Sequence, residues 1–169
     1  MKTRLITLTA VMAALVAVTT KAVQIPTPVT QGYLNAGDIL VIFSGFILGP
    51  RMGFIAGGIG SMIADIMTSY PFFYITLIVK GAEGAIPGFS WWRFNPRLSR
   101  SANILGLLFS SIIAAFVMAG GYFLFQWKVF GWVVAAAGLI PNMLQGVLGI
   151  TGALLIYSAL DPYLLRWDL

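Results

Sequence analysis

The sequence predicts an all-α membrane protein built from six transmembrane helices that form one domain over residues 1–169. Two compositional observations carry this prediction. Of the residues, 59% are hydrophobic and only 9% are charged, whereas a soluble domain carries about 25% charged residues. So little charge cannot cover a surface that faces water, and the apolar surplus of a chain this short must therefore face lipid.

The placement of the basic residues predicts the orientation. The cations expected on one side of the membrane are Lys2, Arg4, Arg51, Arg93, Arg97, Arg100 and Arg166. Lys21 and Lys128 remain near the other side. Because Lys and Arg are enriched in cytoplasmic loops, both termini are expected in the cytoplasm. The net charge of +5 therefore reflects membrane orientation, and no nucleic acid is expected as a partner.

Residue types that the sequence lacks exclude several kinds of chemistry. There is no cysteine and no histidine, which removes thiolate ligands and nucleophiles, the commonest metal ligand and the usual proton shuttle. The sequence also has no P-loop motif, GxxxxGK followed by Ser or Thr, so it cannot bind ATP in that way. We expect no catalytic residue, metal or cofactor, and a protein that is not an enzyme.

The first helix is expected over residues 5–23. We expect it to be a retained span, because no convincing small-residue cleavage site precedes Lys21. Small residues three and four positions apart form a smooth stripe along one face of this helix. The stripe consists of Ala10, Ala13, Ala14 and Ala17. It suits either packing within this protein or docking to a different subunit.

Residues 24–37 carry no charge but two prolines and two glycines, which favours an ordered loop outside the membrane. The second helix is expected over 38–49, with the Asp38 carboxylate accepting from amides of its first turn. These 12 residues, at about 1.5 Å each, are too few to cross about 30 Å of hydrocarbon. The second helix must therefore be buried among its neighbours or lie where the bilayer is thin.

The third helix is expected over 51–69 and the fourth over 72–86, joined by a tight turn. Gly53 and Gly57 form a GxxxG motif in a run dense in small residues, which predicts that the third helix is central and contacts several neighbours. Pro87 is expected to end the fourth helix, since proline lacks the amide hydrogen that a helix needs.

The fifth and sixth helices are expected over 102–127 and 133–160. The connection over 88–101 contains tryptophans and arginines, which suit anchoring at lipid headgroups. Trp127 and Lys128 mark the opposite interface of the membrane.

Three charges lie well inside the apolar runs, namely Asp65, Lys80 and Glu83. An ionisable group at membrane depth is costly unless it is paired or faces a water-filled cavity. Lys80 and Glu83 are three residues apart on one helix and can neutralise each other. They form either a purely structural ion pair or the polar floor of a ligand site, and we favour the ligand site. Asp65 is expected to pair with Lys80 or to cap the outer turn rather than to bind the ligand directly.

Asn142 and Gln145 project from similar faces of the last helix, where their amides suit a neutral heteroaromatic solute or contacts between helices. The charge-free segment 27–35 can cover them as a lid. Aromatic residues expected near the same opening are Tyr33, Tyr70, Phe73 and Tyr74. Together these features predict one small-molecule pocket that opens outward, with Tyr33 and Asn35 of the lid and Tyr74 among its contacts.

The pattern resembles the S component, the substrate-capturing membrane subunit, of an energy-coupling factor (ECF) vitamin transporter. The resemblance covers nearly the whole chain. It rests on the overlapping AxxxA spacing of the first helix and, in order, on IPTPVTQGYLNAGD, LGPRMGFIAGGIGSMIADIMTSYP, KGAEG and PNMLQG. Within the family, the chain is most similar to the branch assigned to hydroxymethylpyrimidine or pyridoxine. Pantothenate- and riboflavin-type S components are the neighbouring alternatives, and a non-transport membrane assembly subunit is a third.

The resemblance implies a protein of the prokaryotic cell membrane that binds a vitamin-type molecule on its outer side. It also implies three partner subunits: a membrane coupling subunit that docks on the alanine stripe, and two cytosolic ATPases. The binding residues carried over by position are Lys80, Glu83, Asn142 and Gln145. The lid and pocket segments lack histidine and tryptophan, which speaks against a thiamine-type site. A nearly neutral Lys80–Glu83 pair favours a small neutral ring over anionic pantothenate.

Overall fold

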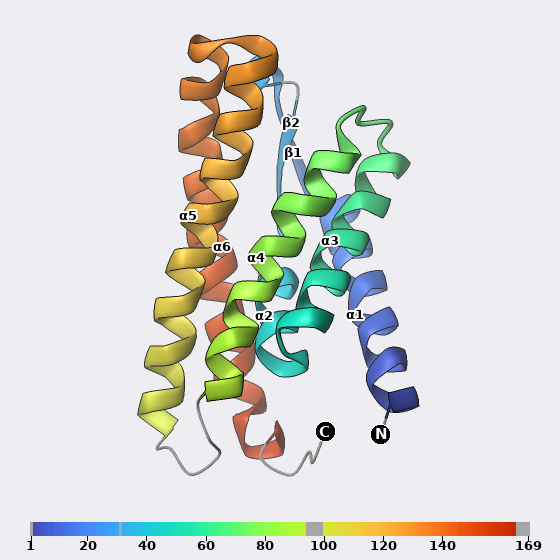
Figure 1. Ribbon diagram of the computed structural model, residues 1–169, viewed down its shortest axis with the longest axis vertical. Coiled ribbons are helices and arrows are strands. Elements are labelled where there is room, and N and C mark those ends of the chain that lie inside the picture. The colour runs from blue at the N-terminus through green and yellow to red at the C-terminus, as the bar shows by residue number, and fades with distance from the viewer. Residues whose placement is uncertain (1, 31, 94–99, 165–169) are drawn as a thin grey trace.

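The computed structural model describes residues 2–30, 32–93 and 100–164 of the 169-residue chain. These residues form six helices and one antiparallel hairpin (Figure 1). The elements are α1 (Lys2–Ala22), β1 (Gln24–Thr27), a 3-10 turn (Pro28–Thr30), β2 (Gly32–Asn35), α2 (Asp38–Leu48), α3 (Pro50–Met67), α4 (Phe73–Arg93), α5 (Arg100–Phe130) and α6 (Trp132–Leu164). The predicted helical class with six helices is confirmed, and the loop expected before α2 contains the hairpin.

The long helices run side by side along the long axis of the molecule, and the start of α1 lies at the same end as the last turns of α6 (Figure 1). Helix α3 packs against α1, α2 and α4, while α5 packs against α4 and α6. Helix α3 is therefore central, as its small residues predicted.

The short helix α2 is enclosed by its neighbours. All six residues from Val41 to Phe46 are buried, and the helix packs against α3, α4 and α6. The hairpin lies above α2 in Figure 1. At about 1.5 Å per residue α2 extends only about 16 Å, so the hairpin and α2 together occupy the length that one long helix would fill. This arrangement allows a polar space to exist above the start of α2.

Glycines permit α2, α3 and α4 to cross with their backbones in contact. A Cβ atom on Gly45 of α2 would lie 1.8 Å from the carbonyl oxygen of Gly84 on α4. A Cβ atom on Gly53 of α3 would lie 2.4 Å from that same oxygen. No other residue fits such a crossing without displacing a backbone, so the GxxxG motif of α3 is used inside the protein.

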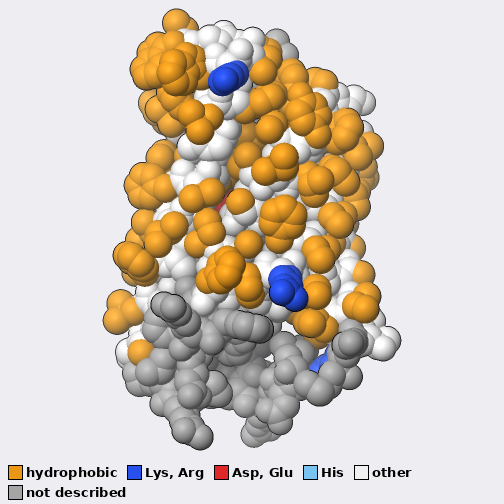
Figure 2. All heavy atoms as spheres, viewed as in Figure 1, with side chains coloured by type: hydrophobic (Ala, Val, Ile, Leu, Met, Phe, Trp, Pro, Cys, Tyr) orange, Lys and Arg blue, Asp and Glu red, His pale blue; other side chains and the backbone are white. Residues whose placement is uncertain are grey.

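The surface formed by the described residues is largely apolar. Figure 2 shows hydrophobic side chains over most of the visible face outside the grey atoms, and Phe109 of α5 and Val133 of α6 are 69% and 78% exposed. By length and composition, three helices can cross a membrane: α1 over Thr3–Ala22, α5 over Ser101–Phe130 and α6 over Trp132–Leu160. So broad an apolar surface suits contact with lipid.

Two predicted helix ends are wrong. Pro87 lies inside α4, which continues to Arg93, because proline removes only one amide hydrogen bond and its side chain is fully buried among neighbouring helices. Helix α5 continues to Phe130, and Gly131 alone, at φ +88°, joins it to α6. The polar connection expected over 88–101 belongs partly to α4 and α5, and residues 94–99 lie outside the described residues, as does Arg166.

Candidate functional site

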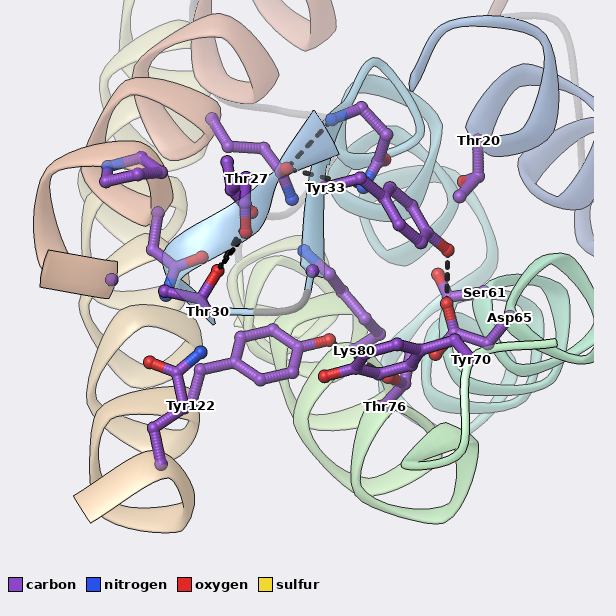
Figure 3. A pocket seen from close by; sticks show the side chains of 17 residues that line it. Thr20, Thr27, Thr30, Tyr33, Ser61, Asp65, Tyr70, Thr76, Lys80 and Tyr122 are labelled. Atoms are coloured by element: carbon purple, nitrogen blue, oxygen red, sulfur yellow. Dashed lines mark hydrogen bonds between the residues drawn. The ribbon is translucent and has the colours of Figure 1, made fainter. Parts of the chain in front are cut away.

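A cavity lies beneath the hairpin and is bordered by α1, α3, α4, α5 and α6 (Figure 3). The space between its walls, counted together with the opening to solvent, measures about 560 Å³. Its lining residues are Thr20, Thr27, Thr30, Gly32, Tyr33, Asn35, Ser61, Asp65, Tyr70, Thr76, Lys80, Tyr122, Gln126, Gly138, Pro141, Asn142 and Gln145. Almost all of them are polar, in contrast to the outer surface of the same helices.

A buried ionic cluster forms the floor of this cavity. Lys80 Nζ lies 2.5 Å from Asp38 Oδ1 and 2.8 Å from Glu83 Oε2, and these three side chains are at most 3% exposed. The predicted pairing of Lys80 with Glu83 is therefore confirmed. The ammonium also lies 5.8 Å from the ring centre of Tyr122, within cation–π range. Only Lys80 lines the cavity itself, and Glu83 lies behind it.

Asp38 does not cap α2 as predicted. The N-cap position is Gly37, and no side chain caps the helix there. The Asp38 carboxylate instead turns inward to Lys80, because an unpaired ammonium buried at this depth would be very costly. The cluster therefore holds two carboxyl groups and one ammonium, and Asp38 is a partner of Lys80 that the sequence did not predict.

Gln145 of α6 connects this cluster to the hairpin. Its Nε2 donates to Asp38 Oδ2 at 2.9 Å. Its Oε1 accepts from the backbone amide of Asn35 at 2.9 Å and from the side-chain amide at 3.3 Å. Asn142, one turn earlier, lines the cavity, and no hydrogen bond of its side chain is found in the described part of the chain. Gln145 is thus committed to the fold, whereas the Asn142 amide remains available to a solute.

A second contact joins the hairpin to α3. The Tyr33 hydroxyl donates to Oδ1 of Asp65 (Figure 3), so Asp65 contacts the lid and forms no salt bridge with Lys80. Burial and the nearby carboxylate raise the pKa of the Tyr33 phenol, which keeps it protonated and able to donate. The lid is therefore held at two points, one on α3 and one on α6.

The last turn of α3 positions Asp65 and Tyr70 together. Tyr70 N donates to Asp65 O at 2.9 Å and Ser69 N to Ile66 O at 3.1 Å, with Ser69 in the left-handed region at φ 57°. These bonds define a Schellman motif, which folds the chain back over the preceding turn. Tyr70 consequently lines the cavity and lies edge-on to the Tyr33 ring at 6.2 Å. Burial raises the pKa of Tyr70 to about 12.

The structure separates the predicted aromatic residues into two groups. Tyr33 and Tyr70 line the cavity. Phe73 and Tyr74 are 38% and 49% exposed and lie outside it, where Tyr74 contacts other rings, including Phe125 at 6.3 Å. The expectation that Tyr74 contacts a ligand is therefore corrected, because the first turn of α4 directs its side chain away from the cavity.

Sequence reasoning missed part of the polar wall. Ser61, Thr76, Tyr122 and Gln126 line the cavity, yet none was predicted. The signal is a spacing of four: Ser61 precedes Asp65, Thr76 precedes Lys80, and Tyr122 precedes Gln126 by four residues. Because residues at i and i+4 share a helix face, three helices each carry one polar pair toward the same space.

Two residues of the alanine stripe of α1 are buried and the other two are exposed. Ala13 and Ala17 are 8% and 6% exposed, and α1 packs against α3, where a Cβ on Gly60 would lie 2.5 Å from the carbonyl oxygen of Ala13. Ala10 and Ala14 lie on the exposed face. Packing within the protein therefore accounts for one half of the stripe, and only Ala10 and Ala14 remain open to another subunit.

An apolar helical surface around a polar cavity beneath a hairpin is the architecture of a helical membrane protein with a polar interior space. A family model described as "ECF-type riboflavin transporter, S component" matches residues 1–162. The chain belongs to this family of ECF-transporter S components.

Individual relatives agree with this assignment. A protein of Pyrococcus woesei described as "Uncharacterized protein in gap 3'region" is 36% identical over 135 residues, which are 80% of this chain and 86% of that protein. The thiamine precursor transporter HmpT of Lactococcus lactis subsp. cremoris is 29% identical over 149 residues, 85% of this chain and 80% of HmpT. The solved structure "Structure and mechanism of the S component of a bacterial ECF transporter" matches with a TM-score of 0.73 at 16% identity, covering 98% of this chain and 100% of that one. The last similarity concerns the fold alone.

Proposed function

We propose that this chain is the substrate-binding subunit of an ATP-driven vitamin importer and that it captures hydroxymethylpyrimidine or pyridoxine at the outer face of a prokaryotic cell membrane. The observation that carries the proposal is the polar cavity beneath the hairpin, which lies inside an otherwise apolar helical molecule. The similarity to a thiamine precursor transporter supports a pyrimidine, because hydroxymethylpyrimidine is a precursor of this kind.

The charges around the cavity support a neutral or weakly basic substrate. Within the described part of the site, the single ammonium of Lys80 already has two partners, Asp38 and Glu83, and the third carboxyl group, Asp65, contacts Tyr33. An anion such as pantothenate would find no free cation in the described part of the site. A small ring with amino, hydroxymethyl and ring-nitrogen groups instead finds carboxylate, hydroxyl and amide partners.

Ligand-induced stabilisation of the detergent-purified protein tests this substrate class. Hydroxymethylpyrimidine, pyridoxine, pantothenate and riboflavin are each added across a range of concentrations, and thermal unfolding is recorded. A solute that binds only the folded protein raises the unfolding temperature by mass action, with about 2.7 kcal/mol of stabilisation at 100 times Kd. We expect a shift with one of the first two compounds. A shift with pantothenate or riboflavin alone overturns the substrate class, and no shift with any compound favours an assembly subunit.

Orientation and partners complete the proposal. We propose that the start of α1, with Arg4, and the start of α3, with Arg51, lie on the cytoplasmic side, because positive residues are enriched there. The membrane coupling subunit docks on the exposed half of the α1 stripe, Ala10 and Ala14. Two cytosolic ATPases supply hydrolysis, since this sequence has no P-loop motif.

Bulky substitutions on α1 test the docking face. Replacing Ala14 with Phe is expected to abolish uptake of labelled hydroxymethylpyrimidine by cells that carry the complete transporter, while purified protein still binds the compound. Leu155→Phe is the matched control, because Leu155 is 66% exposed on α6, and it should transport normally. Full uptake by the Ala14 variant would contradict docking at this face. Ala13→Phe should instead impair folding, as Ala13 contacts α3.

A further inference from the structure

The two carboxylate oxygens of Asp65 have different surroundings. The side chain is 3% exposed and lies on the wall of the cavity. Oδ1 accepts the Tyr33 hydroxyl of the hairpin. Oδ2 is buried and has no hydrogen-bond partner among the described residues. Thr76 interacts with the same carboxylate from α4, but no hydrogen bond joins its hydroxyl to Oδ2.

A buried carboxylate oxygen without a donor is unfavourable, and more so inside a membrane protein. Asp65 shares its side of the cavity with Ser61 and with Thr20 (Figure 3). The hydroxyl oxygen of Thr20 is buried and also has no partner in the described part of the chain. This side of the cavity therefore holds two buried oxygens whose hydrogen-bonding capacity is unused within the described residues.

We propose that Asp65 is a specificity-determining residue that holds the hairpin with Oδ1 and accepts an N–H or O–H donor of the bound solute with Oδ2. The inference rests on the proposed function and extends its contacts to α3. Tyr33 fixes the orientation of the carboxylate before the solute arrives, so the donor meets an acceptor that is already in position. Closure of the lid and selection of a donor-bearing solute thus depend on one side chain.

Affinities of matched compounds test the assignment. Hydroxymethylpyrimidine is compared with one analogue in which hydrogen replaces the amino group and with another in which methyl replaces the hydroxymethyl group. Wild-type protein is expected to lose about tenfold or more in affinity for one of the two analogues, as a hydrogen bond to a charged group contributes about 1.5–3 kcal/mol. Asp65→Asn should bind the parent compound more weakly and should discriminate little between it and that analogue.

Tyr33→Phe is the control, because it removes the lid contact and keeps both carboxylate oxygens. Its overall affinity is expected to fall, but the ratio between compounds should stay at the wild-type value. An unchanged ratio in Asp65→Asn overturns the inference while the proposed function stands. Failure of the wild-type protein to bind hydroxymethylpyrimidine or pyridoxine overturns both.

Asp65→Ser is the second variant should Asp65→Asn not fold. If neither variant folds, wild-type protein labelled with carbon-13 aspartate is used instead. The infrared band of the aspartate carboxylate stretch must then shift on binding, and an unshifted band overturns the inference.

Discussion

At the scale of single residues, Gln145 joins the ionic cluster to the hairpin through its hydrogen bonds. It donates to Asp38 and accepts from both amide groups of Asn35, and it is 3% exposed. Replacing it with Leu leaves a buried carboxylate oxygen without its donor, so we expect a loss of about 2 kcal/mol of stability together with weaker binding. Thermal unfolding without ligand and titration calorimetry measure the two effects.

Asn142→Leu is the comparison for Gln145, since both residues line the cavity on α6. The Asn142 side chain makes no hydrogen bond within the described residues, so its loss should leave the unfolding temperature of the free protein nearly unchanged and lower only the affinity. Equal destabilisation by both substitutions would show that the Gln145 contacts do not hold the lid.

Ser69 offers a residue-scale test of the turn that positions Asp65. It occupies the left-handed position of the Schellman motif at φ 57°, where glycine is the usual residue. Ser69→Gly should therefore stabilise the protein by roughly 1 kcal/mol, the cost of this conformation for a residue with a Cβ. Ser69→Val should be destabilising. A lower unfolding temperature for Ser69→Gly in detergent would contradict this account of the turn.

At this scale, a contact could be predicted from the sequence only when its two residues lie close together along the chain. The Lys80–Glu83 pair lies three residues apart on one helix, so its spacing alone predicted the contact. Asp38 contacts Lys80 across 42 residues, and no local pattern distinguishes that role from a helix cap. Tyr33 and Asp65 are separated by 32 residues, and their contact likewise depends on the tertiary fold.

At the scale of elements, the crossing of α2, α3 and α4 should be far less tolerant of added volume than the exposed helices. A Cβ on Gly84 would lie 2.4 Å from the carbonyl oxygen of Gly53, so Gly84→Ala must push two backbones apart. We expect a loss of about 1–3 kcal/mol, the usual cost of overpacking. Thermal unfolding of the purified variant checks the value.

Gly120→Ala on α5 is the matched control for this crossing, because no atom lies within 4 Å of the Cβ that it would add. Alanine has the higher helix propensity, so this variant should keep or raise the unfolding temperature, by up to about 1 kcal/mol. Similar losses in both variants would mean that the glycine crossing does not limit packing.

Composition and hydrophobic runs predicted the six helices, since burial in lipid leaves few alternatives to helix. They could not predict the hairpin. Its register pairs Gln24 with Asn35 and Thr27 with Gly32, and its position is set by contacts of Tyr33 and Asn35 with α3 and α6. Likewise, Pro87 stays within α4 because tertiary burial outweighs one missing hydrogen bond.

At the scale of the whole molecule, a solute in the cavity would contact side chains from five helices as well as the hairpin. The wall includes Thr20 of α1, Asp65 of α3, Lys80 of α4, Tyr122 of α5 and Gln145 of α6. The floor is expected to move least, since its ionic cluster is buried and Glu83 of the cluster precedes Gly84 of the glycine crossing. The hairpin contacts α3 through Tyr33 and α6 through Asn35. Its Ile25 and Val29 side chains are exposed. Motion during binding should therefore be confined to the hairpin.

Hydrogen exchange followed by mass spectrometry tests whether motion is confined to the hairpin. In the free protein, amides of 24–35 should exchange much faster than those of α3 and α4, because local opening needs only the Tyr33 and Asn35 contacts to break. Saturating hydroxymethylpyrimidine should slow exchange in the hairpin and leave Gly53 and Gly84 peptides unchanged. In Tyr33→Phe the free hairpin should exchange faster still, and the ligand should protect it less. Protection spread evenly over all six helices would instead indicate that the entire bundle tightens around the solute.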